Sequence, residues 1–208
     1  MTAEERMDKE MRRLTLLFAT MGMALVLSTG VAVALTVDCT AGRGCVGTDD
    51  PDTLNGSIGN DDMDGRQAAD KLFGNDGHDW MQGDAYAPTD TSTDGNDRVF
   101  GGAGFDGVVG YGGDDLLSGG ARGDFIDAIE NSDNPGEDTV RSGAGNDFID
   151  AIDKTKDTLD CGIGTKDRVF YDKNIDTVEN CEIARTQYPE EFFGAASTEA
   201  EQTNARTR

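Results

Sequence analysis

The sequence is poor in the residues that usually build a globular core. Hydrophobic residues make up 36% of the chain, aromatic residues make up 7%, and the mean hydropathy is −0.52. A chain of 208 residues with so little apolar material is not expected to bury an ordinary two-layer core. Another kind of interaction must therefore hold the fold together.

Catalytic signatures are also scarce. The chain has one histidine, His78, and it contains neither a G-x-S-x-G nor an H-E-x-x-H motif. An EF-hand loop needs Glu at its twelfth position, but the two candidate loops, starting at Asn60 and Asp90, end on Lys71 and Gly101. We therefore expect no EF-hand and no enzyme, with a small secreted hydrolase of unfamiliar site as the alternative.

Basic residues are few, with 18 Lys and Arg against 41 Asp and Glu, and the net charge is −23. This balance excludes nucleic acids and anionic membranes as natural partners. Of the 41 acidic residues 30 are aspartate, which favours turns and short-range chelation rather than helices. Hard divalent cations such as Ca²⁺, which take several oxygen ligands, are the expected counter-charge.

The N-terminus has the layout of a secretory signal peptide. Arg12 and Arg13 precede an apolar run over residues 14–27, and the small residues Ala32 and Ala34 follow it. This order predicts a signal peptide over residues 1–34 and a secreted, extracellular or cell-surface protein. The alternative is an uncleaved membrane anchor, because the run approaches the length of a spanning helix.

Glycine recurs every nine residues, and the same residue types follow each glycine at fixed distances. The glycines stand at positions 47, 56, 65, 74, 83, 101, 110 and 119, with Ser92 in the remaining place. Five residues after the starts stand Asp52, Asp61, Asp70, Asp79, Asp97, Asp106, Asp115 and Asp124. Two residues further stand Leu54, Met63, Leu72, Met81, Val99, Val108, Leu117 and Ile126. Only the unit that starts at Gly83 breaks the pattern, with Pro88 and Asp90 in these two places.

The best units, GGAGFDGVV at 101–109 and GYGGDDLLS at 110–118, resemble the G-G-x-G-x-D-x-U-x nonapeptide of RTX (hemolysin-type) calcium-binding repeats. The resemblance covers roughly residues 47–182. It implies an all-β fold, a right-handed parallel β-roll with two units per coil and with calcium bound in the turns between stacked coils.

The resemblance also implies a ligand set. The glycines, among them Gly101, Gly104, Gly110, Gly113 and Gly119, would take positive φ and turn carbonyl oxygens inward. The carboxylates would come from the eight aspartates named above and from Asp147 in a later unit. Each apolar residue would point into the roll.

Units stacked eighteen residues apart predict two edges of ligands. One edge would carry Asp61, Asp79, Asp97 and Asp115. The other would carry Asp52, Asp70, Asp106 and Asp124, interrupted near Pro88 by a surface loop and a missing ion site.

The later units are weaker, and they determine the predicted domains. We expect a disulfide-closed cap over 35–46, the calcium-binding roll over 47–127, degenerate coils with little or no calcium over 128–182, and a flexible tail over 183–208. Four cysteines in an exported chain predict two disulfides, Cys39 with Cys45 and Cys161 with Cys181, the second pair lying about one coil apart. The alternative, a four-cysteine zinc site, lacks the paired C-x-x-C spacing.

The sequence thus predicts a monomer that folds on binding calcium and serves as an extracellular structural or interaction module with an unidentified protein or glycan partner. The alternative interpretation of this composition is a disordered acidic segment. The calcium-binding hypothesis predicts the same disordered state for the chain without calcium.

Overall fold

The computed structural model describes residues 34–40, 42–84, 94–130 and 134–188, and these residues form strands and turns without an α-helix. Within these ranges no helix is long and apolar enough to cross a membrane. In chain order the strands are β1 Thr36–Asp38, β2 Gly44–Val46, β3 Thr53–Asn55, β4 Asp62–Arg66, β5 Lys71–Asp76, β6 Trp80–Asp84, β7 Arg98–Ala103, β8 Gly107–Val109, β9 Leu116–Ala121, β10 Phe125–Asp127, β11 Thr139–Ala144, β12 Phe148–Ala151, β13 Thr158–Asp160, β14 Arg168–Tyr171, β15 Thr177–Glu179 and β16 Ile183–Arg185.

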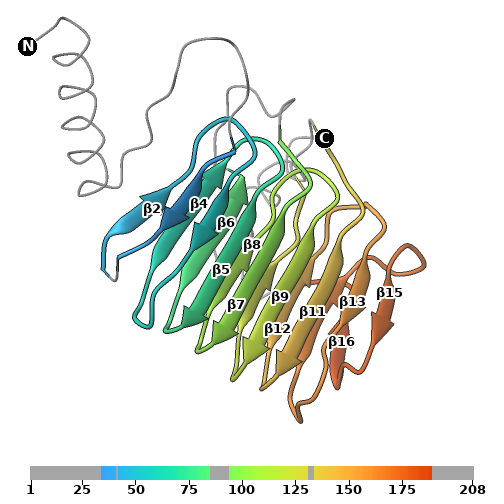
Figure 1. Ribbon diagram of the computed structural model, residues 1–208. Helices are drawn as coiled ribbons and strands as arrows, with labels where there is room; N and C mark the ends of the chain where they lie inside the picture. Colours follow the sequence, from blue (N-terminus) through green and yellow to red (C-terminus); the bar gives the residue numbers. More distant parts are fainter. Residues whose placement is uncertain (1–33, 41, 85–93, 131–133, 189–208) are drawn as a thin grey trace, which may run out of the picture.

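The strands form two parallel eight-stranded sheets, one from the odd-numbered and one from the even-numbered strands. Consecutive strands lie in opposite sheets, so the chain winds as a β-solenoid whose coils follow one another along the molecule (Figure 1). The expected all-β roll of parallel strands is confirmed. Residues 35–46, predicted as a cap, contribute β1 and β2, which pair with β3 and β4 as the first coil.

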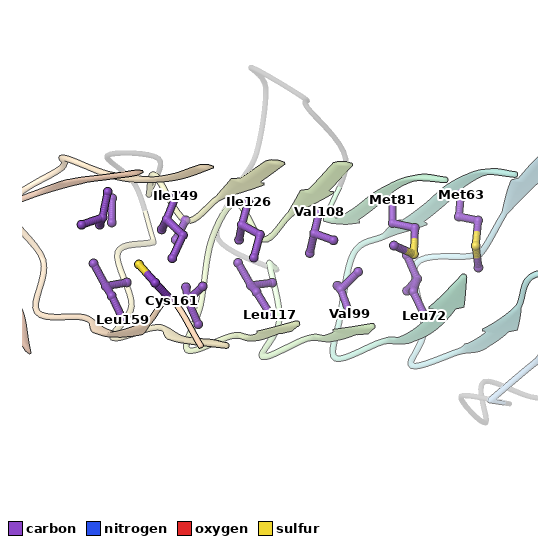
Figure 2. Close-up of a cluster of buried hydrophobic side chains, with 14 of the residues drawn as sticks. Met63, Leu72, Met81, Val99, Val108, Leu117, Ile126, Ile149, Leu159 and Cys161 are labelled. Atoms are coloured by element: carbon purple, nitrogen blue, oxygen red, sulfur yellow. The ribbon is translucent and has the colours of Figure 1, made fainter. Parts of the chain in front are cut away.

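The core is a double row of single apolar residues. Each short strand points its central side chain inward because neighbouring residues alternate faces. The fully buried side chains are Leu54, Met63, Leu72, Met81, Val99, Val108, Leu117, Ile126, Val140, Ile149, Leu159 and Val169. Figure 2 shows the two rows facing each other, with Met81, Val108 and Ile126 from one sheet opposite Leu72, Val99 and Leu117 from the other. All eight apolar positions of the nine-residue ladder are therefore core residues.

The coil length changes along the chain. Leu54 pairs with Leu72, eighteen residues later, but Leu72 pairs with Val99, which is 27 residues later. The nine extra residues match the segment 85–93, where the sequence predicts a surface loop and which lies outside the described residues. A second extended coil separates Leu117 from its partner Val140 by 23 residues.

Aromatic side chains stack on the outer face of the even-numbered sheet. Trp80 on β6 lies across Gly107 of β8, where a Cβ would come within 2.2 Å of its ring, and it stacks at 6.3 Å on Phe125 of β10. Phe125 stacks on Phe148 at 5.5 Å, and Phe148 contacts Phe170 at 5.4 Å. Such stacks stabilise neighbouring strands.

Both predicted disulfides are present, and they staple the two ends of the described solenoid. Cys39 and Cys45 have their Cα atoms 5.5 Å apart, and Cys161 and Cys181 have theirs 5.1 Å apart. The described cysteines include no free thiol, so the zinc alternative does not apply to them.

The predicted tail begins too early at residue 183. β16 (Ile183–Arg185) pairs with β14, and Tyr188 packs on Phe170 and donates a hydrogen bond to Asp150 Oδ1. Residues 183–188 thus belong to the solenoid. The signal peptide predicted over 1–34 lies, except for Ala34, outside the described residues, as does the remainder of the predicted tail.

Candidate calcium-binding turns

Aspartates line both edges of the solenoid in two columns. In each column the backbone N–H of one aspartate donates to Oδ1 of the aspartate one coil later, at 2.6 to 3.0 Å. The first column contains Asp52, Asp70, Asp97, Asp115, Asp138, Asp157 and Asp176. The second column contains Asp61, Asp79, Asp106, Asp124, Asp147 and Asp167, and it ends on Glu182.

The predicted assignment of aspartates to edges is wrong beyond the first insertion. Asp97 and Asp115 stack on Asp70 rather than on Asp79, and Asp106 stacks on Asp79. The reason is that an insertion of nine residues keeps the nine-residue phase but shifts every later unit to the opposite edge. The nine predicted aspartates are still all in the columns.

The column carboxylates are buried and only half satisfied. From Asp52 to Asp167 each is at most 3% exposed. While Oδ1 accepts the backbone hydrogen bond, the other oxygen, Oδ2, is buried without a hydrogen-bond partner in ten of them: Asp70, Asp79, Asp97, Asp106, Asp115, Asp124, Asp138, Asp147, Asp157 and Asp167. A buried anionic oxygen without a partner is costly unless a cation accompanies it.

The glycine that opens each turn leaves room for these oxygens. A Cβ on Gly101 would lie 2.3 Å from the carbonyl oxygen of Gly119 and 2.7 Å from Asp106 Oδ2. Gly119 is similar, with Asp124 Oδ2 at 2.5 Å and the Ser142 carbonyl oxygen at 2.6 Å. A carboxylate oxygen of the same turn and a carbonyl oxygen of the next coil therefore lie close together beside each of these two glycines.

Most of the predicted glycines are required for close approach rather than for positive φ. Of the five that the sequence analysis named, only Gly113 has a positive φ, of 101°. Gly104 has no such φ, but a Cβ there would lie 1.6 Å from the carbonyl oxygen of Gly77 in the preceding coil. Positive φ is instead concentrated at the second turn position, which Gly102 and Gly120 occupy.

Burial raises the pKa of many column carboxyls. Desolvation is the largest cause, and it raises the pKa of Asp70 and Asp124 to about 7 and that of Asp97 and Asp138 to about 8. Neighbouring aspartates of the same column add to the increase, whereas hydrogen bonds from the backbone oppose it. Burial and mutual repulsion thus disfavour the charged form of these carboxyls in the folded protein, and a bound cation would stabilise that charged form.

The two columns differ in the turns that carry them. In the second column the turns at 56–61, 74–79, 101–106, 119–124 and 142–147 each contain two or three glycines. Both long insertions fall in the first column, before Asp97 and before Asp138. Acidic side chains accompany them, since Asp84 precedes the first insertion and Glu130 lies in the second.

Asp84 and Glu130 are site residues that the repeat pattern does not reveal. Asp84 is 0% exposed, and it accepts a hydrogen bond from the backbone N–H of Gly95 at 3.2 Å. Burial, together with neighbouring carboxylates, raises the pKa of Asp84 to about 10 and that of Glu130 to about 9. The only sequence signal was their position at the edges of the irregular units.

The fifth turn position forms an outer ladder instead of supplying ligands with its side chain. Asn60 Oδ1 accepts a hydrogen bond from His78 N–H, and Asn96 Oδ1 accepts one from Asp114 N–H. His78 is exposed, and its Nδ1 accepts a hydrogen bond from Phe105 N–H.

The described residues fit calcium better than a metal held by side chains alone. Among them no three His, Cys, Asp or Glu side chains form a ready metal cluster. The oxygen donors instead alternate between carboxylate Oδ2 atoms and backbone carbonyls, a hard donor set typical of Ca²⁺. The structure therefore supports sites between stacked turns.

We expect the calcium-free protein to be more structured at pH 5 than at pH 8. Asp70, Asp97, Asp124 and Asp138 keep their protons up to about pH 7 or 8 when folded, whereas an unfolded aspartate loses its proton near pH 4. The folded form therefore binds more protons between about pH 4 and 8, and its stability falls as pH rises through that range. Far-UV circular dichroism of metal-free protein at the two pH values measures this, and more β-structure at pH 8 would contradict it.

Comparisons with known proteins agree with the geometry. The model of the RTX calcium-binding nonapeptide repeat matches four copies, in residues 46–81, 91–126 and 132–151. No curated protein and no solved structure matches significantly. The matched ranges contain all nine predicted aspartates and end before the last described coils, with Asp97 to Asp124 all in the middle range and Asp147 in the last.

Proposed function

We propose, from the premise that this chain carries RTX calcium-binding nonapeptide repeats, that it binds several calcium ions between stacked turns and folds on binding them. The observation that carries the proposal is the repeated buried Oδ2 atom without a hydrogen-bond partner, which occurs in ten column aspartates. In seven of them, Asp70, Asp79, Asp97, Asp106, Asp115, Asp124 and Asp167, this oxygen lies beside a glycine, and we infer that its missing partner is a small cation.

Calcium would act as a link between coils. The ten column aspartates with an unpartnered Oδ2 already accept a hydrogen bond from the preceding coil through Oδ1, and binding through Oδ2 would add an ionic contact along the same column. A ligand that binds only the folded form adds about 2.7 kcal/mol per site when it is in hundredfold excess over its Kd. Several such sites would offset the repulsion within a chain of net charge −23.

The module is proposed to work outside the cytoplasm as a structural or interaction domain without catalysis. Two disulfides support an oxidising compartment. The N-terminal sequence supports export, and the single exposed histidine offers little for catalysis. A partner protein or glycan on a cell surface remains part of this proposal.

Isothermal calorimetry of the column variants tests the calcium proposal. Asp106→Ala and Asp115→Ala are each expected to lower the number of bound ions or to weaken binding at least tenfold, because each removes a carboxylate ligand. His78→Ala, an exposed turn substitution, is the control and should bind like the wild type.

An asparagine variant separates the ligand role from the structural role. Asp115→Asn retains an oxygen that can accept the Asp97 N–H hydrogen bond, but it removes the charge. We expect it to lose calcium affinity nearly as much as Asp115→Ala. Wild-type binding by Asp115→Asn, or equal losses in His78→Ala, would count against the assignment.

A further inference from the structure

The two outer faces of the solenoid carry different charges. The residues on either side of each buried core residue point outward, because neighbouring strand residues alternate faces. On the adjacent strands β5, β7, β9 and β11 (Figure 1) these outward positions hold Lys71, Phe73, Arg98, Phe100, Leu116, Ser118, Thr139 and Arg141. We call these residues the basic face, because they include three cations and no anion.

The outer face of the even-numbered sheet lacks this feature. Its corresponding positions include Asp62, Asp64, Asp127 and Asp150. With 41 acidic and 18 basic residues in the chain, four adjacent strands without an outward carboxylate depart from the overall composition. The basic face is therefore a local feature whose charge opposes the net charge of the protein.

The cations of the basic face are exposed and lie near one another. Lys71 and Arg98 are register partners on neighbouring strands, and Arg141 lies two strands beyond Arg98, about 10 Å away at the usual strand spacing. None of the three forms an ion pair with another described residue. They are therefore available to an external anion.

Arg98 and Arg141 line the same open hollow at the first-column edge of this face. Asp114 and Glu137 line it too, but both carboxylates already have partners. Asp114 Oδ1 accepts a hydrogen bond from the Glu137 N–H at 2.8 Å, and the Glu137 carboxylate pairs with Lys156 at 2.7 Å. The two guanidinium groups thus remain without an anionic partner among the described residues.

Calcium would make this hollow more positive. Its other lining residues include the buried column aspartates Asp97 and Asp115, whose Oδ2 atoms have no hydrogen-bond partner. An ion held by these aspartates would offset their charge, and beyond about 8 Å the remaining exposed charges are largely screened at physiological salt. The charge that an external anion meets here would then be set mainly by Arg98 and Arg141.

The chemistry of the basic face fits a linear glycan that carries carboxylates. Each of the four strands is paired on both sides, so no edge is free for an added peptide strand. Phe73 and Phe100 stack on each other at 5.3 Å, so they do not form the separate platforms on which successive bases of a nucleic acid stack. Guanidinium groups, in contrast, bind carboxylates through two parallel hydrogen bonds.

We propose that the basic face binds an acidic polysaccharide through Arg98 and Arg141, with Lys71 as a third cation. This inference rests on the proposed function, because the face exists only in the folded solenoid and the columns beside it need calcium to lose their negative charge. It names the chemistry of the glycan partner, a polymer of uronic acid.

Calorimetry of the full chain with an oligogalacturonate in saturating calcium tests the proposal, with the carboxyl-reduced, neutral oligomer as the ligand control. The wild type is expected to bind only the acidic oligomer. Arg98→Gln/Arg141→Gln is expected to lose at least tenfold in affinity, and Lys71→Gln to lose less. Arg168→Gln/Arg185→Gln, which removes the same charge from exposed positions of the even-numbered sheet, is the matched control and should bind like the wild type.

The outcomes separate this inference from the proposed function. Circular dichroism shows whether each variant has folded, and Arg98→Gln alone replaces the double variant if that one does not fold. Equal losses in the two double variants, tighter binding of a single-stranded oligonucleotide, or no binding by the calcium-folded wild type overturns the basic face and leaves the calcium sites intact. A chain that is folded and binds the acidic oligomer equally well in chelator overturns the proposed function and leaves the basic face intact.

Discussion

Removal of calcium is expected to convert the protein from a β-rich fold into a largely unstructured chain. Each strand contributes one main apolar side chain to the core, so burial alone compensates poorly for the conformational entropy lost on folding. The aspartates from Asp52 to Asp167 are at most 3% exposed, and without a cation their charges repel along each column. The net charge of −23 adds to this repulsion.

Far-UV circular dichroism in chelator and after millimolar calcium addition measures the change. The signal should shift from a coil-like to a β-rich spectrum, and the shift should reverse when chelator is added again. Magnesium is the control cation, and it should be much less effective because it requires smaller, near-octahedral sites and dehydrates reluctantly. An unchanged spectrum would contradict the proposal that calcium is needed for the fold.

Gly104→Ala is expected to destabilise the fold strongly even in saturating calcium. A Cβ at this position would lie 1.6 Å from the carbonyl oxygen and 2.7 Å from the carbonyl carbon of Gly77, and both atoms belong to the backbone of the adjacent coil. Separating the coils there would also disturb Asp79 and Asp106, which are joined by a hydrogen bond of 2.9 Å. The expected loss is about 4 kcal/mol or more, which lowers Tm by roughly 8–16 °C in a chain of this size.

Gly44→Ala is the matched control for this substitution. A Cβ on Gly44 meets no heavy atom within 4 Å, and its φ is not in the left-handed region, so the change is expected to stay within about 0.5 kcal/mol of the wild type. Thermal unfolding of both variants in the same calcium concentration gives the comparison. Similar Tm values for the two variants would refute the close-packing role of Gly104.

The nine-residue pattern predicted the core and the column residues, but it could not assign them to edges. Leu72, Val99 and Leu117 are buried as their place in the pattern indicates. The edge on which Asp97 lies, however, depends on whether residues 85–93 count as half of a coil or as an insertion. Both possibilities preserve the spacing of nine residues. Only the pairing of Leu72 with Val99 distinguishes them.

The residues that the nine-residue pattern does not mark lie where this pattern is interrupted. Asp84 is buried and Glu130 is partly buried where the chain departs from the regular turn, and no repeat position marks that departure. β16 was missed because Glu182 replaces the column aspartate and Ala184 replaces the larger apolar residue. Glu182 Oε2 nevertheless accepts the Asp167 N–H hydrogen bond, and Ala184 pairs with Val169.

The ring that lies across Gly107 belongs to Trp80, the only tryptophan of the chain. Trp80 and Gly107 are 27 residues apart, and they come together only when the coil that contains the nine extra residues has closed. The protein therefore has its single tryptophan where two strands paired across 27 residues meet, the largest sequence separation between paired strands of the described solenoid. Its emission reports the assembly of that one coil, separately from the total β-structure of the molecule.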